Sequence, residues 1–263
     1  DNVEQASIKN EMAIKIVSEG EDYLVIEKPA GLAVHGGGNL GDEKTLADWL
    51  IERYPEITAV GDDPIRPGIV HRLDKEVSGL MVVAKNQASF EDLKRQFQER
   101  TIKKEYLVLV HGQVSQDAGT IDFPITRSRD GYRMAAMPGG AEELLRRKHP
   151  KNRDQGNIDS WLKAKEALTE FEVKKRFVNF TFLKAIIKTG RAHQIRVHFY
   201  AYGHPVVGDP LYNTKRSRVK DEKTGINRIF LASCLLGFNS RDGVWQEFQL
   251  PLPEDLENFL PKN

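Results

Sequence analysis

Two short motifs, far apart in the chain, carry the residue types that could perform chemistry. Residues 71–74 read His-Arg-Leu-Asp, and residues 189–198 read Thr-Gly-Arg-Ala-His-Gln-Ile-Arg-Val-His. The first motif places a lone carboxylate, Asp74, beside an arginine at the mouth of an apolar segment. Breaking a bond at an anomeric carbon needs a nucleophile or an anion, and a carboxylate can serve as either.

Asp74 allows two interpretations on this motif alone. It could be the carboxylate of a helix N-cap or a turn, which is common before Lys-x-x-Ser-Gly, or it could be the reactive group. To react near neutral pH it must stay ionised in a fairly dry cleft, which burial opposes and an adjacent arginine favours. Arg191, which follows a glycine in the second motif, is the predicted partner, because a guanidinium keeps its charge and meets a carboxylate in a planar fork.

Four separated motifs, in the same order, resemble the RluA-type family of pseudouridine synthases over roughly residues 20–253. They are Lys-Pro-Ala-Gly at 28–31, Arg-x-Asp at 72–74, Lys-Glu-Tyr at 104–106 and the motif at 189–198. The resemblance implies an RNA enzyme that isomerises uridine without a cofactor. It also implies an α+β fold: an extended, bent, mostly antiparallel sheet with flanking helices and an active cleft across its middle.

The resemblance assigns the catalytic step to Asp74, Arg191 and Tyr106. Asp74 is expected to be the catalytic carboxylate, with Arg191 beside it. Tyr106 lies in an apolar segment, where core packing is the default role of a lone tyrosine. By resemblance it instead faces the cleft, stacks on the uracil and serves as the base that removes the C5 proton.

Three further residues are expected to contact the substrate. A uridine in folded RNA is stacked, so its ring must leave the stack before its glycosidic bond can be reached. By resemblance Arg72 fills the space left behind, and a structural salt bridge is the alternative for this side chain. Ile195 is expected to pack on the uracil face opposite Tyr106, and His71 to contact the RNA.

Two residues near these motifs allow two interpretations each. Lys28, before a proline, is either structural or faces a phosphate, and His35, on an expected loop, is either structural or contacts RNA. His193 and His198 are five residues apart, which on a helix points their rings in different directions. We therefore expect no metal site.

Composition limits the class of protein. The 263 residues are 40% hydrophobic and 29% charged, which suits one large domain or two small ones. No apolar run approaches the ~20 residues of a membrane helix and no signal pattern opens the chain, so a cytoplasmic location without membrane contact is expected. The single cysteine, Cys234, excludes an internal disulfide framework and, within its apolar run, is expected to be a buried, inert thiol.

The charge distribution does not identify RNA by itself. The net charge is +1, but basic blocks occur at residues 100–104, 146–151 and 215–220. Each block could follow an RNA backbone, although a solvated loop is the simpler interpretation. By resemblance the partner is RNA, with large-subunit ribosomal RNA favoured and transfer RNA left open, and the protein is expected to be a monomer.

Hydrophobic periodicity predicts a mixture of strands and helices. Strands are expected at 22–27, 79–84, 105–110, 168–174, 177–187 and 244–250, and helices at 45–54, 89–99 and about 195–202. They do not alternate regularly, and no Gly-rich turn joins a strand to a helix. The pattern therefore favours α+β with a largely antiparallel sheet over a doubly wound nucleotide-binding fold.

Two segments are expected to lie outside the catalytic core. Residues 1–13 are polar and read as a tail or linker before one catalytic domain at 14–263, with no S4-type domain, which many relatives carry. Residues from about 141 to 163 are expected to form an RNA-contacting insertion, because five basic residues lie within eight positions. The alternative is that Trp161 and Leu162 dock into the core.

Two other functional classes compete with an RNA isomerase. A retaining glycoside or nucleoside hydrolase needs a second carboxylate about 5 Å from the first, and no clear candidate accompanies Asp74. A non-catalytic RNA-binding module would be supported by loss of the motif aspartate or arginine, and both are present. A pseudouridine synthase is the function that the sequence favours.

Overall fold

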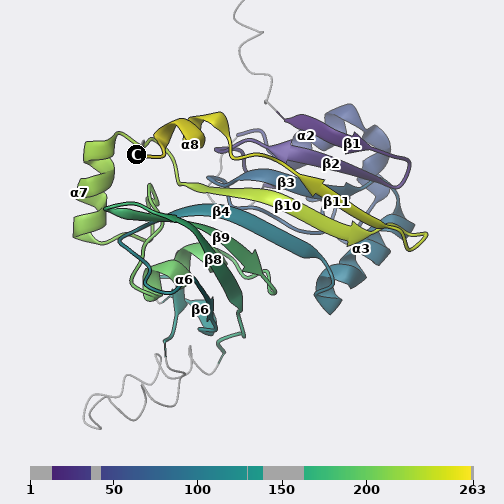
Figure 1. Ribbon diagram of the computed structural model, residues 1–263. Coiled ribbons are helices and arrows are strands. Elements are labelled where there is room, and N and C mark those ends of the chain that lie inside the picture. The colour runs from purple at the N-terminus through teal and green to yellow at the C-terminus, as the bar shows by residue number, and fades with distance from the viewer. Residues whose placement is uncertain (1–13, 37–42, 129, 139–162, 262–263) are drawn as a thin grey trace, which may run out of the picture. The chain divides into compact units, whose positions relative to one another are not determined.

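The computed structural model describes residues 14–36, 43–128, 130–138 and 163–261 (Figure 1). The chain divides into two compact units: unit 1 within Asp1–Ile102 and Leu235–Leu250, and unit 2 within Lys103–Cys234 and Pro251–Asn263. The expected tail at 1–13 lies outside the described residues, as does all of the expected insertion except residue 163. The single catalytic domain at 14–263 stays a prediction.

Unit 1 contains an antiparallel sheet in the order β1 (Lys15–Glu19), β2 (Tyr23–Lys28) and β3 (Ser78–Ala84). Every residue of β3 is buried, so both faces of this strand are covered. That is why β3 appears in the sequence as a continuous apolar run rather than an alternating one. The strands predicted at 22–27 and 79–84 are confirmed.

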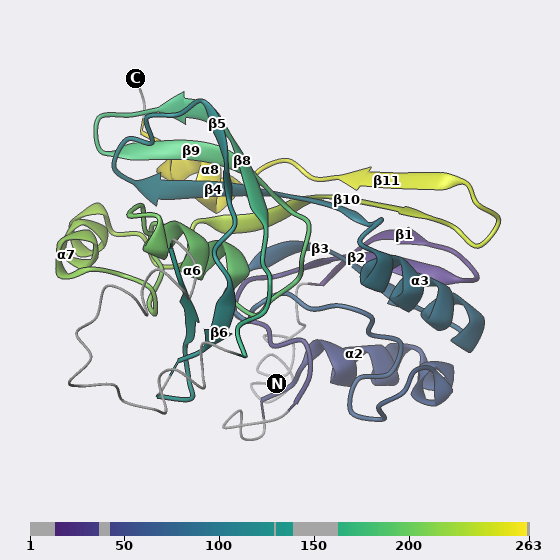
Figure 2. The ribbon, with the colours of Figure 1, turned by 90° about the horizontal axis from the view of Figure 1, so that it is seen from below.

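Helices α2 (Leu46–Arg53) and α3 (Gln87–Glu99) lie on the same face of this sheet (Figure 2). Thr45 caps α2 in a reciprocal box with Asp48, and the Asn86 side chain accepts a hydrogen bond from the Ser89 N–H at the start of α3. These caps satisfy N–H groups that have no partner inside the helix. A short 3₁₀ helix, η2 (Pro55–Ala59), follows α2. Both predicted helices are confirmed.

Unit 2 contains a second antiparallel arrangement, in the order β4 (Lys103–His111), β9 (Phe180–Ile187), β8 (Thr169–Arg176) and β5 (Ala118–Ile121). The strands predicted at 168–174 and 177–187 are β8 and β9, which form a hairpin in which the Phe177 N–H donates to the Phe180 carbonyl at 2.8 Å. A separate hairpin joins β6 (Ile125–Arg127) to β7 (Met134–Ala136). The unit also includes α6 (Gln194–Ala201), α7 (Lys215–Thr224) and α8 (Glu254–Phe259).

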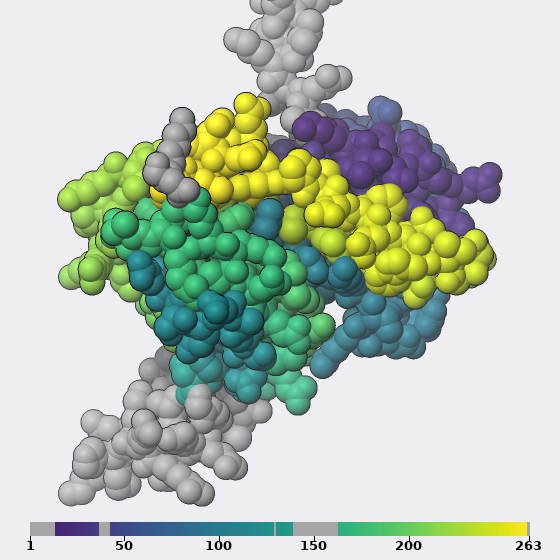
Figure 3. All heavy atoms as spheres, in the orientation of Figure 1, coloured from purple at the N-terminus to yellow at the C-terminus, as the bar shows by residue number. Residues whose placement is uncertain are grey.

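Strand β10 (Leu231–Asn239) begins in unit 2 and ends in unit 1, where it pairs with β11 (Trp245–Gln249). Atoms of β11, in yellow, lie at the surface in Figure 3. Cys234 of β10 is buried, and its thiol donates to the Glu105 carbonyl at 3.3 Å. The predicted burial is confirmed, and burial raises the pKa of this thiol to about 11, which disfavours the thiolate near neutral pH.

The described elements are helices and antiparallel strands, which confirms the α+β class. No helix in the described part of the chain is long and apolar enough to cross a membrane. Neither helix α7 nor strand β10 was among the elements predicted from the sequence. The basic block at 215–220, for which a solvated loop was the simpler interpretation, is helical.

Candidate active site

Asp74 lies on a loop that is fixed to β3 before it reaches the carboxylate. Gly68 has a φ of +69°, and a Cβ on it would lie 2.4 Å from the Ala84 carbonyl oxygen, so the position requires glycine. The Ala84 N–H donates to the Gly68 carbonyl at 2.9 Å. Ile69 then forms a bridge with Val83. The chain therefore enters the His-Arg-Leu-Asp motif alongside β3.

His71 continues this attachment. The Val82 N–H donates to Nε2 of His71 at 3.0 Å, and the imidazole stacks on Phe97 with 4.6 Å between ring centroids. Because Nε2 accepts a hydrogen bond, the ring proton lies on Nδ1. These contacts give His71 a structural role in the loop, and its contact with substrate stays a prediction.

Two buried apolar residues flank the carboxylate. Leu73 and Val77 are 4% and 2% exposed, and the Val77 N–H donates to the Asp74 carbonyl at 3.1 Å to close a turn. Asp74 itself is half-buried. The structure thus shows the turn that the sequence allowed, with a carboxylate that is not enclosed in the core.

Lys28 holds the turn that follows Asp74. Its side chain is fully buried, and its ammonium donates to the carbonyls of Pro29 and Leu32, both at 2.8 Å, and of Lys75 at 3.1 Å. The Gly31 N–H also donates to the Lys75 carbonyl, at 2.8 Å. Between the two interpretations of Lys28, the structure therefore supports the structural one.

Arg72 lies beside His35. The residue is exposed, and Nη1 lies 3.4 Å from Nε2 of His35. His35 also makes a contact of 2.8 Å between Nδ1 and the Gly36 carbonyl. Within the described residues Arg72 forms no ion pair, and both its expected role in the RNA stack and the alternative of a structural salt bridge stay predictions.

Unit 2 carries the other predicted catalytic residues. Tyr106 lies in β4, is 6% exposed and is paired with Ala185 of β9. Lys104 is two residues earlier, and alternate residues of a strand share a face. A Cβ on Gly190 would lie 3.8 Å from the Lys104 ammonium, so this side chain reaches the glycine that precedes Arg191. Burial lowers the pKa of Lys104 to about 8.

The loop that carries Arg191 is shaped by a buried amide. The Gln194 carbonyl oxygen accepts from the Thr189 hydroxyl at 2.7 Å and from the Arg191 N–H at 3.1 Å. The Gln194 amide group donates to the Leu168 carbonyl at 2.9 Å. Arg191 is half-buried, and its Nε donates to the Glu166 carbonyl at 3.0 Å. Gln194 thus ties this loop to the β8 region, a role that sequence analysis missed.

The start of α6 is held in an unusual backbone conformation. His193 has a backbone φ of +54°, which residues other than glycine rarely adopt. Its Nδ1 lies 2.8 Å from the Tyr212 hydroxyl, which also accepts from the Met134 N–H at 2.7 Å. Ile195, the next residue but one, is 5% exposed. This turn points the chain into α6, which confirms the predicted short helix.

A buried ion pair follows in the same helix. The Arg196 guanidinium donates through Nε and one Nη to the two oxygens of Asp209, at 2.8 and 2.9 Å, and the side chains are 2% and 0% exposed. Asp209 also accepts from the N–H groups of Leu211 and Tyr212, at 2.8 and 3.0 Å. Sequence analysis did not single out this pair. The partners are thirteen residues apart, and only tertiary folding brings them together.

Both ring nitrogens of His198 make contacts within the fold. Its Nε2 lies 2.8 Å from the Phe123 carbonyl, and its Nδ1 lies 2.9 Å from the Thr169 hydroxyl. Burial lowers the pKa of His198, so the neutral ring is favoured. Across the described ranges, no group of three or more His, Cys, Asp or Glu side chains is placed to hold a metal ion.

Asp74, Arg72 and His71 thus belong to unit 1, and Tyr106, Arg191 and Ile195 to unit 2. The predicted partnership of Asp74 and Arg191 joins residues of different units and stays a prediction.

Residues 22–201 match the family described as RNA pseudouridylate synthase. A protein of Aquifex aeolicus named uncharacterized RNA pseudouridine synthase is 40% identical over 252 residues, covering 93% of this chain and 71% of that protein. Ribosomal large subunit pseudouridine synthase D of Nitrosomonas europaea is 38% identical over 94% of this chain and 64% of its own length. The solved structure of human RNA pseudouridylate synthase domain containing 1 superposes with a TM-score of 0.67, at 26% identity, over 91% of this chain and 84% of that one.

Proposed function

Because the chain belongs to the RluA-type family of RNA pseudouridine synthases, which are isomerases, we propose that it converts uridine to pseudouridine in large-subunit ribosomal RNA. The family match over residues 22–201 carries the reaction class. The choice of RNA is supported by relatives named for the large ribosomal subunit, including the protein of Nitrosomonas europaea. The resemblance of the motif at 71–74 supports Asp74 as the catalytic carboxylate.

The proposed reaction balances without a co-reactant. The bond between N1 of uracil and C1′ of ribose breaks, the detached ring turns, and C5 bonds to C1′. The C5 proton is removed, by Tyr106 in this proposal, and N1 of the product gains a proton. A carbon–carbon bond thus replaces a carbon–nitrogen bond, with no net oxidation or reduction.

Several contacts support this division of roles. The Asp74 loop is held on both sides, by Gly68 before it and by Lys28 behind it, which suits a group that must meet one carbon atom. Arg72 is exposed and carries a planar cation, which suits a side chain that replaces a base in its stack. Base flipping is therefore part of the proposal, with the uracil between Tyr106 and Ile195.

The assignment to ribosomal RNA can be tested by mapping pseudouridines. We expect that deleting the gene removes pseudouridine from one or a few positions in large-subunit ribosomal RNA, as read by chemical labelling. The gene for the intact protein should restore them. If pseudouridine were lost only from transfer RNA, transfer RNA would be the substrate in place of ribosomal RNA. An unchanged pseudouridine map in both RNA classes would contradict the proposal.

Lys104 gives the reaction an expected dependence on pH. With a pKa of about 8 its ammonium is mostly charged at pH 7 and mostly neutral at pH 9. Since this cation lies beside the Gly190–Arg191 turn and the substrate is a polyanion, its loss should weaken substrate binding or reaction. We expect kcat/KM to fall as the pH rises through about 8. In Lys104→Arg that fall should disappear, because a guanidinium stays charged throughout this range.

The comparison of the two pH profiles is the decisive measurement, since titration of uracil or of tyrosine would affect both proteins alike. Lys104→Met should be slower than the intact enzyme at pH 7 and nearly equal to it at pH 9. Identical falls in the intact enzyme and in Lys104→Arg would show that another group titrates.

A further inference from the structure

Helix α7 carries a group of basic residues that do not stabilise the helix itself. Lys215 and Arg216 lie in its first turn, near the positive end of the helix dipole, where cations are unfavourable. Lys215 and Arg218 are three residues apart, and Arg216 and Lys220 are four apart, so like charges are neighbours on the helix. The only fully buried residue of α7 is Ser217, so an apolar face does not hold the helix either.

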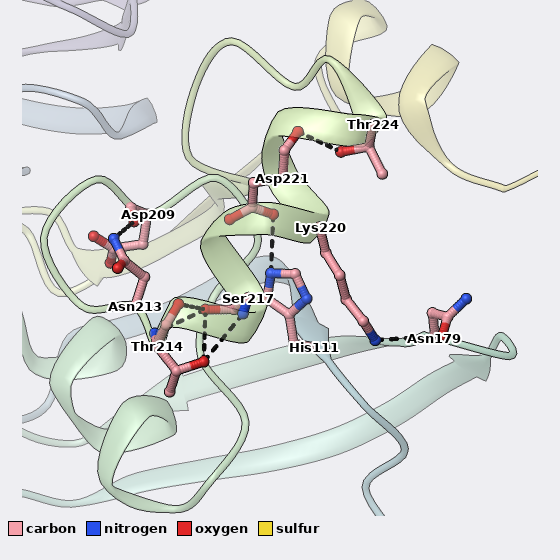
Figure 4. Close-up of polar contacts among 9 residues, drawn as sticks. All are labelled: His111, Asn179, Asp209, Asn213, Thr214, Ser217, Lys220, Asp221 and Thr224. Carbon is pink, nitrogen blue, oxygen red and sulfur yellow. Dashed lines mark hydrogen bonds and ion pairs between the residues drawn. The ribbon is translucent and has the colours of Figure 1, made fainter.

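Polar contacts hold α7 in place instead (Figure 4). Thr214 and Ser217 form a capping box at its start. From β4, Nε2 of His111 donates to the Asp221 carboxylate at 2.9 Å, and the two side chains are 7% and 14% exposed. Figure 4 shows these two side chains pointing toward one another. Asp221 thereby directs its negative charge inward, and the cations keep the outer face.

The outer face presents four exposed cations that have no acidic partner among the described residues: Lys215, Arg216, Arg218 and Lys223. They outnumber Glu222, the carboxylate exposed on the same helix, and they surround Val219, which is 46% exposed. Some exposed cations elsewhere in the described part of the chain do have acidic partners, as in Arg95 with Asp92, Lys174 with Glu172, and Arg241 with Asp22. Atoms of α7, in yellow-green, lie uncovered at the surface in Figure 3.

The helix is also tied to the motif that carries Arg191. The side chain of Asp209 pairs with Arg196 of α6, and its backbone carbonyl accepts a hydrogen bond from the Asn213 side-chain amide at 3.0 Å. Asn213 immediately precedes the Thr214 cap. Within unit 2, the basic face is therefore fixed relative to α6 by a short run of buried and capped residues.

We propose that the basic face of α7, formed by Lys215, Arg216, Arg218 and Lys223, binds the phosphate backbone of the substrate RNA apart from the catalytic residues. This inference rests on the proposed RNA function. Like charges held side by side are destabilising when free and become stabilising when phosphates lie between them. Backbone contacts of this kind carry no sequence information, so the face positions the RNA and does not select the uridine.

The test is a triple variant, Lys215→Ala/Arg216→Ala/Arg218→Ala, measured with a labelled transcript of large-subunit ribosomal RNA. Each lost phosphate contact makes the plot of log affinity against log salt less steep by about 0.7–0.9, so we expect the steepness to decrease by about 2–3 units in the triple variant. The KM for the transcript should rise roughly 10-fold or more at moderate salt, while kcat stays within about two-fold, because release of condensed counterions favours binding and not the chemical step. The melting temperature should be unchanged or slightly higher, since like charges are removed.

A matched control is Arg95→Ala/Lys174→Ala/Arg241→Ala, which removes three exposed cations that already have acidic partners. If this control lost as much RNA affinity as the α7 variant, the effect would be explained by the total charge of the protein, and the proposal would be wrong. An unchanged salt slope in the α7 variant would also overturn it. The proposal would also be wrong if the α7 variant bound RNA as the intact protein does but no longer bound vesicles that contain phosphatidylserine, since the partner would then be a membrane.

The same measurements separate this inference from the proposed function. If the intact protein formed no pseudouridine in the transcript, the proposed substrate would fail. A reduced salt slope in the α7 variant, with this transcript or with a transfer RNA transcript, would still establish the RNA contact.

Discussion

Replacing Asp74 by asparagine is expected to abolish the conversion of uridine to pseudouridine. Asparagine keeps the size and shape of the side chain but carries no charge and cannot act as a nucleophile or as an anion. Losses on the order of 10⁴-fold or more in kcat accompany removal of a central catalytic group in other enzymes. RNA affinity should change little, because phosphate contacts dominate binding. Single-turnover conversion and equilibrium binding of the same transcript measure the two quantities separately.

The matched control is Glu76→Gln, the same chemical change two residues further along the turn. It should leave kcat within a few-fold of the intact enzyme. Gly68, His71 and Val77 hold the loop through contacts of their own, so Asp74→Asn should melt at nearly the same temperature as the intact chain. Appreciable turnover by a clean preparation of Asp74→Asn would remove Asp74 from the catalytic role.

Elements with a clear hydrophobic pattern could be predicted from the sequence. Helix α3 buries Phe90 and Leu93 at helical spacing, and β3 is a short, fully apolar run bounded by turn residues. The Asp74 loop could be placed just before β3 for the same reason. Its chemical role came from resemblance, because a carboxylate before Lys-x-x-Ser-Gly is equally compatible with a turn.

Elements held by polar contacts could not be predicted in this way. Helix α7 has no apolar face, and the residues that fix it, His111 and Asp221, are 110 positions apart. Its one local signal was the spacing of Thr214 and Ser217, a variant of the capping box with serine in place of the usual acidic or amide residue. Strand β10 was hidden for another reason: its apolar run has no period that separates a buried strand from a buried helix.

The buried pair of Arg196 and Asp209 shows a third limit. Arginine and aspartate are mostly exposed in folded proteins, so the sequence gives no reason to place either in the core. In the fold, the two-pronged contact and the N–H groups of Leu211 and Tyr212 offset the loss of hydration of both charges. Within the motif at 189–198, Arg191 attracted the functional interpretation, while Arg196 holds the structure on which that motif depends.

The largest loss of stability is therefore expected from Asp209→Asn. The amide can still accept from the N–H groups of Leu211 and Tyr212, but the Arg196 guanidinium stays buried without its carboxylate. Breaking a buried pair from one side costs about 3–5 kcal/mol in the free energy of unfolding. For a chain of this size that corresponds to a decrease of roughly 10 °C in the melting temperature, measurable by calorimetry or circular dichroism.

Two further variants decide whether the buried charge is the cause. Asp117→Asn breaks an ion pair with Arg176 in which the aspartate is 91% exposed, and it should cost less than about 1 kcal/mol. The double change Arg196→Met/Asp209→Asn removes both buried charges and keeps an oxygen that can accept from the N–H groups of Leu211 and Tyr212, so it should recover part of the stability that Asp209→Asn alone loses. If Asp209→Asn melted like Asp117→Asn, or the double variant were less stable than the single one, an uncompensated guanidinium would not be what destabilises the fold.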